Sequence, residues 1–331
     1  MIAFLLACTA PPQPGVLYNE ERLPVVDMHL HSGDWEDIPA PSQSFIARNF
    51  PFPFNLEPGE LAADIVSAEG IVGQLEGAGI SRGVVFAVYA PRTVGVTDNA
   101  FVIDQIAGFP DRLWGLASLP IDAWGTGEEA ALAELEAALQ QPGMIGIKLA
   151  HAHQHQRMDD PDYFSIYEIA AAQQAPIYLH TGPSPFPGTL SEPAYTDPSY
   201  LEEAIVQFPD VDFILGHACY DFINDTIDEL DRCIDLALRY PNIHIEISAL
   251  GAAGSEIRTQ NYLAVIDRLR EEGLIDRTIY GSDGPQRPGF LASYLSQTIM
   301  AMEAADYTTD EARAVLSDNF TDLFGLDRVT L

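Results

Sequence analysis

The chain has 331 residues, of which 47% are hydrophobic and 10% aromatic, which supports a large folded core and excludes a globally disordered protein. It carries 49 acidic and 16 basic residues, for a formal net charge of −33. A surface of this sign repels phosphate, which argues against nucleic acid and anionic membranes as partners. The three cysteines, Cys8, Cys219 and Cys233, are too few for a disulfide framework and include no Cys-x-x-Cys pair for a zinc site.

The first ten residues, MIAFLLACTA, form an apolar run that ends at Cys8 and is followed by the loose segment PPQPG. This run resembles a bacterial lipoprotein signal, in which the cysteine is acylated and becomes the mature N-terminus. No Lys or Arg precedes the run, and the run is short for a signal core of ~7–15 residues. We predict a lipid on Cys8 and a place in the cell envelope, periplasmic or surface, with a cytoplasmic protein as the alternative. Residues 1–18 are assigned to the signal and tether, and residues 19–331 to one domain.

From residue 22 onward, short β-branched apolar runs alternate with longer helical patterns such as residues 125–140 and 222–240. The predicted strands cover residues 23–31, 83–89, 113–119, 144–149, 175–180, 211–217, 243–248 and 278–283. Nearly continuous apolar strands are typical of a parallel sheet that is buried on both faces. Eight such strands, most of them about thirty residues apart, predict a closed α/β (β/α)₈ TIM barrel.

Two segments depart from the regular repeat. The gap between the first two strands contains SGDWEDIPAPSQSFIARNFPFPFNLEPG and is predicted to be an elaborated first βα loop. Residues 309–326 form a C-terminal helical segment that is expected to pack across the barrel. A doubly wound open sheet is the alternative fold, but the turn after the first strand reads HSGDWED, where that fold would normally have a glycine-rich phosphate turn.

Histidines and one aspartate lie where four of the predicted strands end. His29 and His31 end the first strand, and residues two apart in a strand point to the same side. His180 ends the fifth strand, His217 the sixth and Asp283 the eighth. In a (β/α)₈ barrel this rim carries the active site. Imidazoles and a carboxylate that converge there predict a site for Zn²⁺, Mn²⁺ or Fe²⁺.

Five short motifs lie at the predicted strands in this order along the chain: HxH at 29–31, GIKL at 146–149, LHTG at 179–182, LGH at 215–217 and YGSDGP at 280–285. Together they resemble the amidohydrolase superfamily, in the amidohydrolase-related branch that includes aminocarboxymuconate-semialdehyde decarboxylase. The resemblance covers about residues 22–326. It implies that His29, His31, His180 and Asp283 ligate or border a divalent metal, with Zn²⁺ favoured, and that His217 orients the attacking water or the substrate carbonyl.

Lys148 ends the fourth predicted strand and is the only lysine in the chain. In the binuclear members of the superfamily a lysine at this place is carboxylated and bridges two metals. The resemblance then implies that His180 and His217 bind the second ion and that Asp283 stays on the first. The alternative is a single ion, with Lys148 paired with a carboxylate or holding a carboxylate of the substrate. One or two ions per chain therefore stay open.

Substrate contacts are predicted around the same rim. Arg92 and Arg287 follow the second and eighth strands and are candidates for binding a carboxylate, and His151 follows the fourth. His244 and Glu246 share one face of the seventh strand and are expected to form internal polar pairs. The aromatic residues of the first loop are expected to line the pocket or to anchor the loop: Trp35, Phe52 and Phe54.

These patterns predict a metal-dependent hydrolase that cleaves a C–N or C–O bond of a small amide, ester or lactone. A divalent ion lowers the pKa of a bound water towards ~7, and Asp283 would accept its proton and pass it to the leaving group. The alternative enzyme is a non-oxidative decarboxylase or hydratase that uses the same metal site on a small carboxylic acid. The alternative outside enzymology is a metal-scavenging surface lipoprotein. A homo-oligomer is left open.

Overall fold

The computed structural model describes residues 13–52, 54–121, 125, 127–250 and 255–331. Cys8, on which the predicted lipid depends, lies outside the described residues. None of the described helices combines the length and the apolar composition that a membrane span requires. The tether prediction was too long, because residues 16–18 already belong to the fold. They form β1 (Val16–Tyr18), which pairs with β2 (Glu21–Leu23), and the hydroxyl of Tyr18 donates to the carbonyl of Tyr307.

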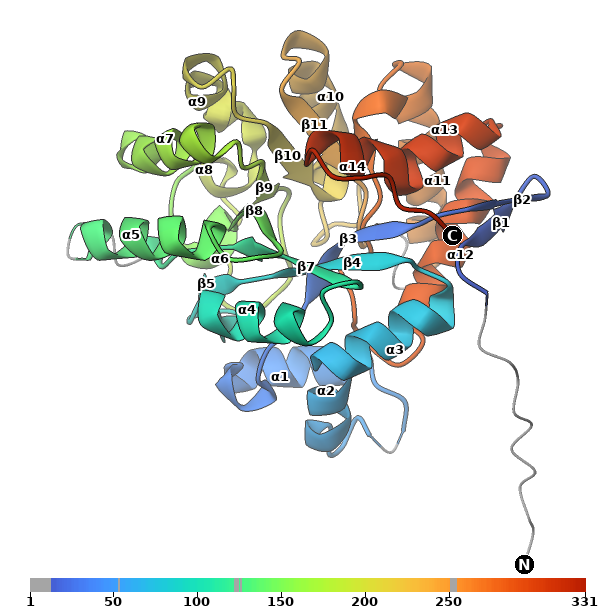
Figure 1. The fold of residues 1–331 in the computed structure, drawn as a ribbon, viewed down its shortest axis with the longest axis horizontal. Helices are drawn as coiled ribbons and strands as arrows, with labels where there is room; N and C mark the ends of the chain where they lie inside the picture. The colour runs from blue at the N-terminus through green and yellow to red at the C-terminus, as the bar shows by residue number, and fades with distance from the viewer. Residues whose placement is uncertain (1–12, 53, 122–124, 126, 251–254) are drawn as a thin grey trace, which may run out of the picture.

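Eight parallel strands form the central sheet, with helices around it (Figure 1). The strands are β3 (Val26–His31), β4 (Arg82–Phe86), β7 (Leu113–Ala117), β8 (Met144–Leu149), β9 (Ile177–His180), β10 (Phe213–Gly216), β11 (Ile243–Glu246) and β12 (Thr278–Ile279). The helices that follow them are α3 (Ala68–Ala78), α4 (Asn99–Gly108), α5 (Glu128–Leu139), α7 (Phe164–Gln173), α9 (Glu202–Gln207), α10 (Leu230–Arg239), α11 (Glu256–Glu271) and α12 (Phe290–Ala304). The predicted (β/α)₈ architecture is confirmed, and each predicted strand overlaps an observed one.

The sheet closes on itself between its first and last strands. Residues 280–284 continue β12 and run beside β3, where the amide of Met28 donates to the carbonyl of Tyr280 over 3.2 Å. Further along, the amide of His31 donates to the carbonyl of Gly284 over 2.7 Å, and the amide of Asp283 donates to the carbonyl of His29 over 3.0 Å. These bonds complete the barrel and place the end of the last strand against the end of the first.

Alternating residues of the strands face two different apolar layers. In β11, Ile243 and Ile245 pack outward in the large cluster that the helices share. Ile214 of β10 and Phe86 of β4 instead face the barrel interior, where they belong to a smaller cluster. Burial on both faces explains why the sequence of these strands is nearly continuously apolar.

The C-terminal segment closes one end of the barrel. It consists of α13 (Thr309–Arg313), a π-helical turn (Ala314–Asp318) and α14 (Asn319–Leu323). Phe320 inserts into the interior cluster, and its ring lies 5.6 Å from that of Trp114 at the start of β7. The predicted packing of this segment across the barrel is therefore confirmed, and any open site must lie at the opposite end.

The first βα loop is elaborated as predicted. It contains the 3₁₀ turn Trp35–Asp37, α1 (Ala40–Ala47) and α2 (Gly59–Ile65) before α3 begins. Its apolar side chains form a separate small cluster of Trp35, Phe50, Ala62 and Ile65. Three shorter elements lie in later βα loops, at the rim where the strands end. They are the hairpin of β5 (Val88–Ala90) and β6 (Gly95–Thr97), the short helix α6 (His151–Gln154) and the short helix α8 (Pro193–Thr196).

Candidate metal centre

One cavity of about 700 Å³ opens where the strands end, opposite the C-terminal segment. The structure brings the six predicted ligand or catalytic residues together on its walls: His29, His31, Lys148, His180, His217 and Asp283. Five barrel strands or their ends supply these side chains. The arrangement follows from the parallel sheet, because all strands present their carboxyl ends at the same rim.

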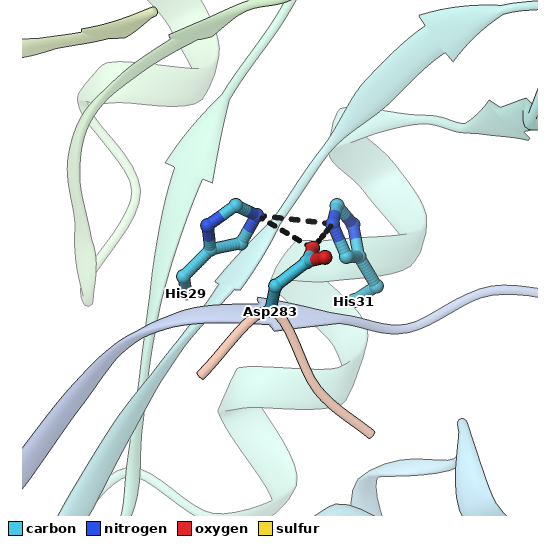
Figure 2. A group of neighbouring side chains, drawn as sticks. All are labelled: His29, His31 and Asp283. Atoms are coloured by element: carbon cyan, nitrogen blue, oxygen red, sulfur yellow. Dashed lines mark hydrogen bonds and ion pairs between the residues drawn. The ribbon is translucent and has the colours of Figure 1, made fainter. Parts of the chain in front are cut away.

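Three of these side chains form a tight group at the closure of the barrel (Figure 2). Nε2 of His29 lies 3.1 Å from Nε2 of His31, and these atoms lie 3.2 and 3.0 Å from Oδ1 of Asp283. Ligand atoms that share one ion at ~2.0–2.2 Å lie about 3–3.5 Å from each other. The spacing and the donor set of His29, His31 and Asp283 therefore fit a divalent metal.

A bulge in β3 aims the two histidines at this point. The pairing of β3 with β4 changes register between Asp27 and Leu30. Met28 packs inside the barrel, whereas Leu30, two residues later, packs outward against the helices. The bulge thus reverses the alternation, so that His29 and His31 both face the cavity. Bulges beside active sites commonly re-aim side chains in this way.

The other edge of His29 is held by a buried polar network. Its Nδ1 lies 2.9 Å from the hydroxyl of Tyr178, 3.0 Å from that of Ser248 and 3.6 Å from Oε1 of Glu246. Glu246 is fully buried, and its Oε2 accepts from Tyr178, Ser248 and the backbone amide of His217. A partner at Nδ1 fixes the ring and leaves the Nε2 lone pair for an ion.

His180 and His217 form a second pair beside this group. Nε2 of His217 lies 3.0 Å from Nδ1 of His180, while Nδ1 of His217 lies 2.8 Å from the hydroxyl of Ser248. If Nδ1–H of each ring is the donor, both Nε2 atoms carry lone pairs. Nε2 of His180 is buried and has no hydrogen-bond partner among the described residues. Such an orphaned acceptor is consistent with a ligand for an ion, although His180 lies outside the tight group of three.

The site holds these groups in the protonation states that metal ligands need. Burial lowers the pKa values of His29 and His180 well below the usual range, so both rings are neutral at pH 7. Burial alone would raise the pKa of Asp283, but His29, His31 and His217 hold it well below its usual range. Neutral imidazoles beside an ionised carboxylate are the forms that bind a divalent cation.

A model of the Amidohydrolase family matches residues 26–326, a span that contains every residue of this site. The chain belongs to the amidohydrolase family. No curated protein sequence matches at a significant level. Solved structures share the fold at low sequence identity. An uncharacterized TIM-barrel protein from Bordetella bronchiseptica is 19% identical, with a TM-score of 0.68, over 92% of this chain and 99% of that one.

Two other similar structures carry assigned activities. A probable 2-pyrone-4,6-dicarboxylic acid hydrolase from Acinetobacter baumannii, with citric acid bound, is 17% identical with a TM-score of 0.61, over 91% of this chain and 99% of that one. A dihydroxybenzoic acid decarboxylase from a Polaromonas species, with manganese and 2-nitroresorcinol bound, is 19% identical with a TM-score of 0.63, over 93% and 98%. In this amidohydrolase, the ligand group itself fits a divalent metal.

Lys148 of this amidohydrolase lies among aromatic rings. Its Nζ is 4.0 Å from the ring centre of Tyr178 and 5.0 Å from that of Phe86. Burial lowers the pKa of Lys148 to about 7, against the attraction of Asp283 and Glu246. Among the described residues, no carboxylate lies within ion-pair distance of its Nζ. The lysine therefore faces the cavity as a buried amine held over aromatic faces.

A disulfide, which the cysteine count did not predict, supports His217. Cys219 and Cys233 are bonded, and the bond joins the turn after β10 to α10. His217, Ala218 and Cys219 all have positive φ, a conformation that non-glycine residues rarely adopt in succession. The bond fixes the end of this unusual turn two residues after His217. Three cysteines exclude a framework of several disulfides, but they leave room for this single bridge.

Only some of the residues that were predicted to contact the substrate line the cavity. Trp35 and Arg287 line it, whereas Arg92 lies outside the lining and its Nη1 is 3.1 Å from Nδ1 of His155. Phe52 and Phe54 are exposed, with 79% and 46% of their surface accessible, and are not part of the lining. The arginine prediction was wrong for Arg92 because the second βα loop turns its side chain towards the fourth.

The prediction for His151 was also wrong. The chain turns into α6 directly after β8, which buries His151 against Tyr163 and brings His153 to the cavity instead. His244 lies near the N-terminal end of β11 beside Asp212, whereas Glu246, on the same face at the C-terminal end of that strand, reaches the site. His244 and Glu246 share a face but differ in their distance from the rim, and sequence periodicity predicts the face of a residue but not this distance.

We predict that replacing His151 with leucine flattens the pH dependence of stability. Burial lowers the pKa of His151 to about 4, and neither ring nitrogen has a partner among the described residues. Between pH 6.5 and 4 the unfolded chain binds a proton that the folded protein does not, so stability falls as the pH falls. From pH 7.5 to 5, wild type should lose about 2 kcal/mol more unfolding free energy than His151→Leu, as measured by urea denaturation. Equal losses of unfolding free energy in wild type and His151→Leu would contradict the assignment.

Proposed function

We propose that this amidohydrolase is a metal-dependent hydrolase that cleaves a C–N or C–O bond of a carbonyl substrate. One observation carries the proposal: two imidazole nitrogens and a carboxylate oxygen lie 3.0–3.2 Å apart at the wall of an open cavity. A site that only stores metal needs no cavity of about 700 Å³ beside its ligands. The cavity favours an enzyme over the metal-scavenging alternative.

His29, His31 and Asp283 would hold the ion, with His180 beside them. When bound, a divalent ion lowers the pKa of water and polarises a carbonyl oxygen. Asp283 is ionised at neutral pH, so its carboxylate can accept a proton from the attacking water and return it to the leaving group. His217, held by Ser248 at Nδ1, accepts from Nδ1 of His180 at its Nε2 and so fixes the His180 ring beside the ligand group.

We propose one ion per chain, and Zn²⁺ as that ion. Two or three imidazoles with one carboxylate are a common donor set for catalytic zinc. Manganese, which is bound in the Polaromonas decarboxylase, is the alternative. A bridged second ion is not favoured, because Lys148 lies over the Tyr178 ring and the second ligand group, His29, His217 and Glu246, shares His29 with the first.

A decarboxylase acting on a carboxylic acid is the second candidate. Arg287 lines the cavity and, within the described part of the chain, has no carboxylate partner, although acidic residues outnumber basic ones by 49 to 16. Arg287 and Lys148 could therefore hold a substrate carboxylate. The similarity to the dihydroxybenzoic acid decarboxylase supports the same candidate.

A panel of substrates should separate the two reactions. Esters, lactones and amides would be followed by acid release, and aromatic and aliphatic carboxylic acids by release of CO₂. We expect hydrolysis, and we expect Asp283→Asn to lower kcat by a factor of about 10² or more, the usual contribution of a proton-transfer group. The exposed control Asp267→Asn, on α11, should keep the wild-type rate. Release of CO₂ without hydrolysis would establish the decarboxylase instead.

Metal analysis of the purified protein should find one divalent ion per chain. The ion should be lost in His31→Ala and Asp283→Ala, because each removes one atom of the tight ligand group. It should be retained in Lys148→Ala and in the control His155→Ala, whose ring lies outside the cavity lining. Two ions in wild type that fall to one or none in Lys148→Ala would show a bridged pair and overturn the single-ion assignment.

We also propose export of the protein as a lipoprotein. The disulfide between Cys219 and Cys233 supports an oxidising compartment, where such bonds persist. Metabolic labelling with palmitate in a bacterial host should mark wild type but not Cys8→Ser, because that substitution removes the thiol that would be acylated. Cys233→Ser is the matched control and should be labelled. Absence of label in all three would exclude lipidation at Cys8.

A further inference from the structure

The cavity extends well beyond the ligand group, and its outer part is apolar. Its volume of about 700 Å³ lies in the range of sites for drug-sized ligands, ~300–1,000 Å³. The outer part is lined mainly by side chains of the first βα loop, among them Trp35, Phe45, Phe50 and Ile65. We call this part the apolar lobe. A carbonyl group bound at the ligand group would leave the apolar lobe unfilled.

The first βα loop builds the apolar lobe as a stable wall. Trp35 and Phe50 belong to the loop's own small core and keep only 6% and 4% of their surface accessible. The side-chain amide of Gln43 in α1 donates to the carbonyl of Trp35. The hydroxyl of Ser42 donates to the carbonyl of Thr93 in the second βα loop. These bonds anchor the loop over the rim and hold the wall of the lobe in place.

An aromatic pair contributes to the wall of the apolar lobe. Phe45 of α1 and Phe186 of the loop after β9 face each other with ring centres 4.8 Å apart, and both line the cavity. His153 lies between this pair and the ligand group, with its ring centre 6.0 Å from Phe186 and 4.8 Å from His180. The apolar lobe and the ligand group are thus two ends of one continuous cavity.

We propose that the substrate carries an apolar chain or ring that fills the apolar lobe while its carbonyl group lies at His29, His31 and Asp283. This inference rests on the proposed hydrolase and names its substrate class, an apolar acyl or alkyl ester, lactone or amide. Charge fits the same orientation. Asp34 and Asp37 lie among the lobe residues of the first loop, whereas Lys148 and Arg287 can receive an anionic group nearer the ligand group.

The apolar lobe should produce a graded preference for chain length. Burying each additional methylene contributes about 0.8 kcal/mol, which corresponds to about fourfold in affinity. We therefore expect kcat/KM for methyl alkanoates to rise about fourfold per methylene from acetate until the lobe is full. The free alkanoates, measured by titration calorimetry, should show the same trend in Kd without any turnover.

Two variants test which wall produces the trend. Phe45→Ala and Phe186→Ala should each reduce the ratio of octanoate to acetate affinity by about tenfold, because each removes buried aromatic surface from the lobe. Phe52→Ala is the matched control, since Phe52 belongs to the same loop but is 79% accessible and lies outside the lining. It should keep the wild-type ratio.

The calorimetry separates failure of this inference from failure of the proposed function. Alkanoate affinity that does not change with chain length would overturn the apolar lobe as a binding site, whether or not esters are cleaved. Affinity that rises with chain length, together with no hydrolysis of any ester, lactone or amide, would support the lobe and overturn the hydrolase. Equal losses in Phe45→Ala and Phe52→Ala would show that the effect comes from the loop as a whole, which contradicts the specific wall.

Discussion

The hydrogen bonds that join β3 to residues 280–284 are the constraint on which the fold and the site both depend. Without them the sheet would have two open edges, which proteins normally cover or charge. The amide of Asp283 donates to the carbonyl of His29, and the amide of His31 donates to the carbonyl of Gly284. The backbone that closes the barrel therefore also positions three ligand side chains. The closure of the barrel and the geometry of the ligand group therefore depend on the same backbone hydrogen bonds.

The barrel could be predicted from the sequence because its strands are buried on both faces and read as apolar runs. The predicted ends of the strands and helices were less accurate, since side-chain chemistry decides where each element begins and ends. The predicted helix over residues 222–240 begins only at Leu230, for example. The carboxylate of Asp221 accepts from the amides of Ile223 and Asn224 and forms a turn that competes with the helix. Periodicity describes the apolar face of a segment but not such local competition.

The candidate site was predictable at the strand ends and less so around them. Strand position places His29, His180 and Asp283 at one rim, and the structure puts them on one cavity. Glu246 was expected to form internal polar pairs, but its partner Tyr178 was missed, although Tyr178 lies two residues before His180 on the same face. Its depth in the barrel depends on the stagger between strands, which short sequence patterns do not encode. Loop residues such as His151 depend on where the chain turns, and this is still harder to derive from spacing.

The charges inside the barrel give an independent argument for the ion. Asp27, Glu246 and Asp283 are buried or partly buried near one another, and Lys148 is the one lysine that the chain can place among them. Burial raises the pKa of Asp27 to about 7 and raises that of Glu246, because desolvation disfavours the charged form of a carboxyl group. Asp283 differs from these two groups, because His29, His31 and His217 hold its pKa well below the usual range and keep it ionised. Among the buried carboxyl groups of the described barrel interior, the one held ionised is therefore the one that lies in the group of His29, His31 and Asp283, where an anionic oxygen suits a divalent cation.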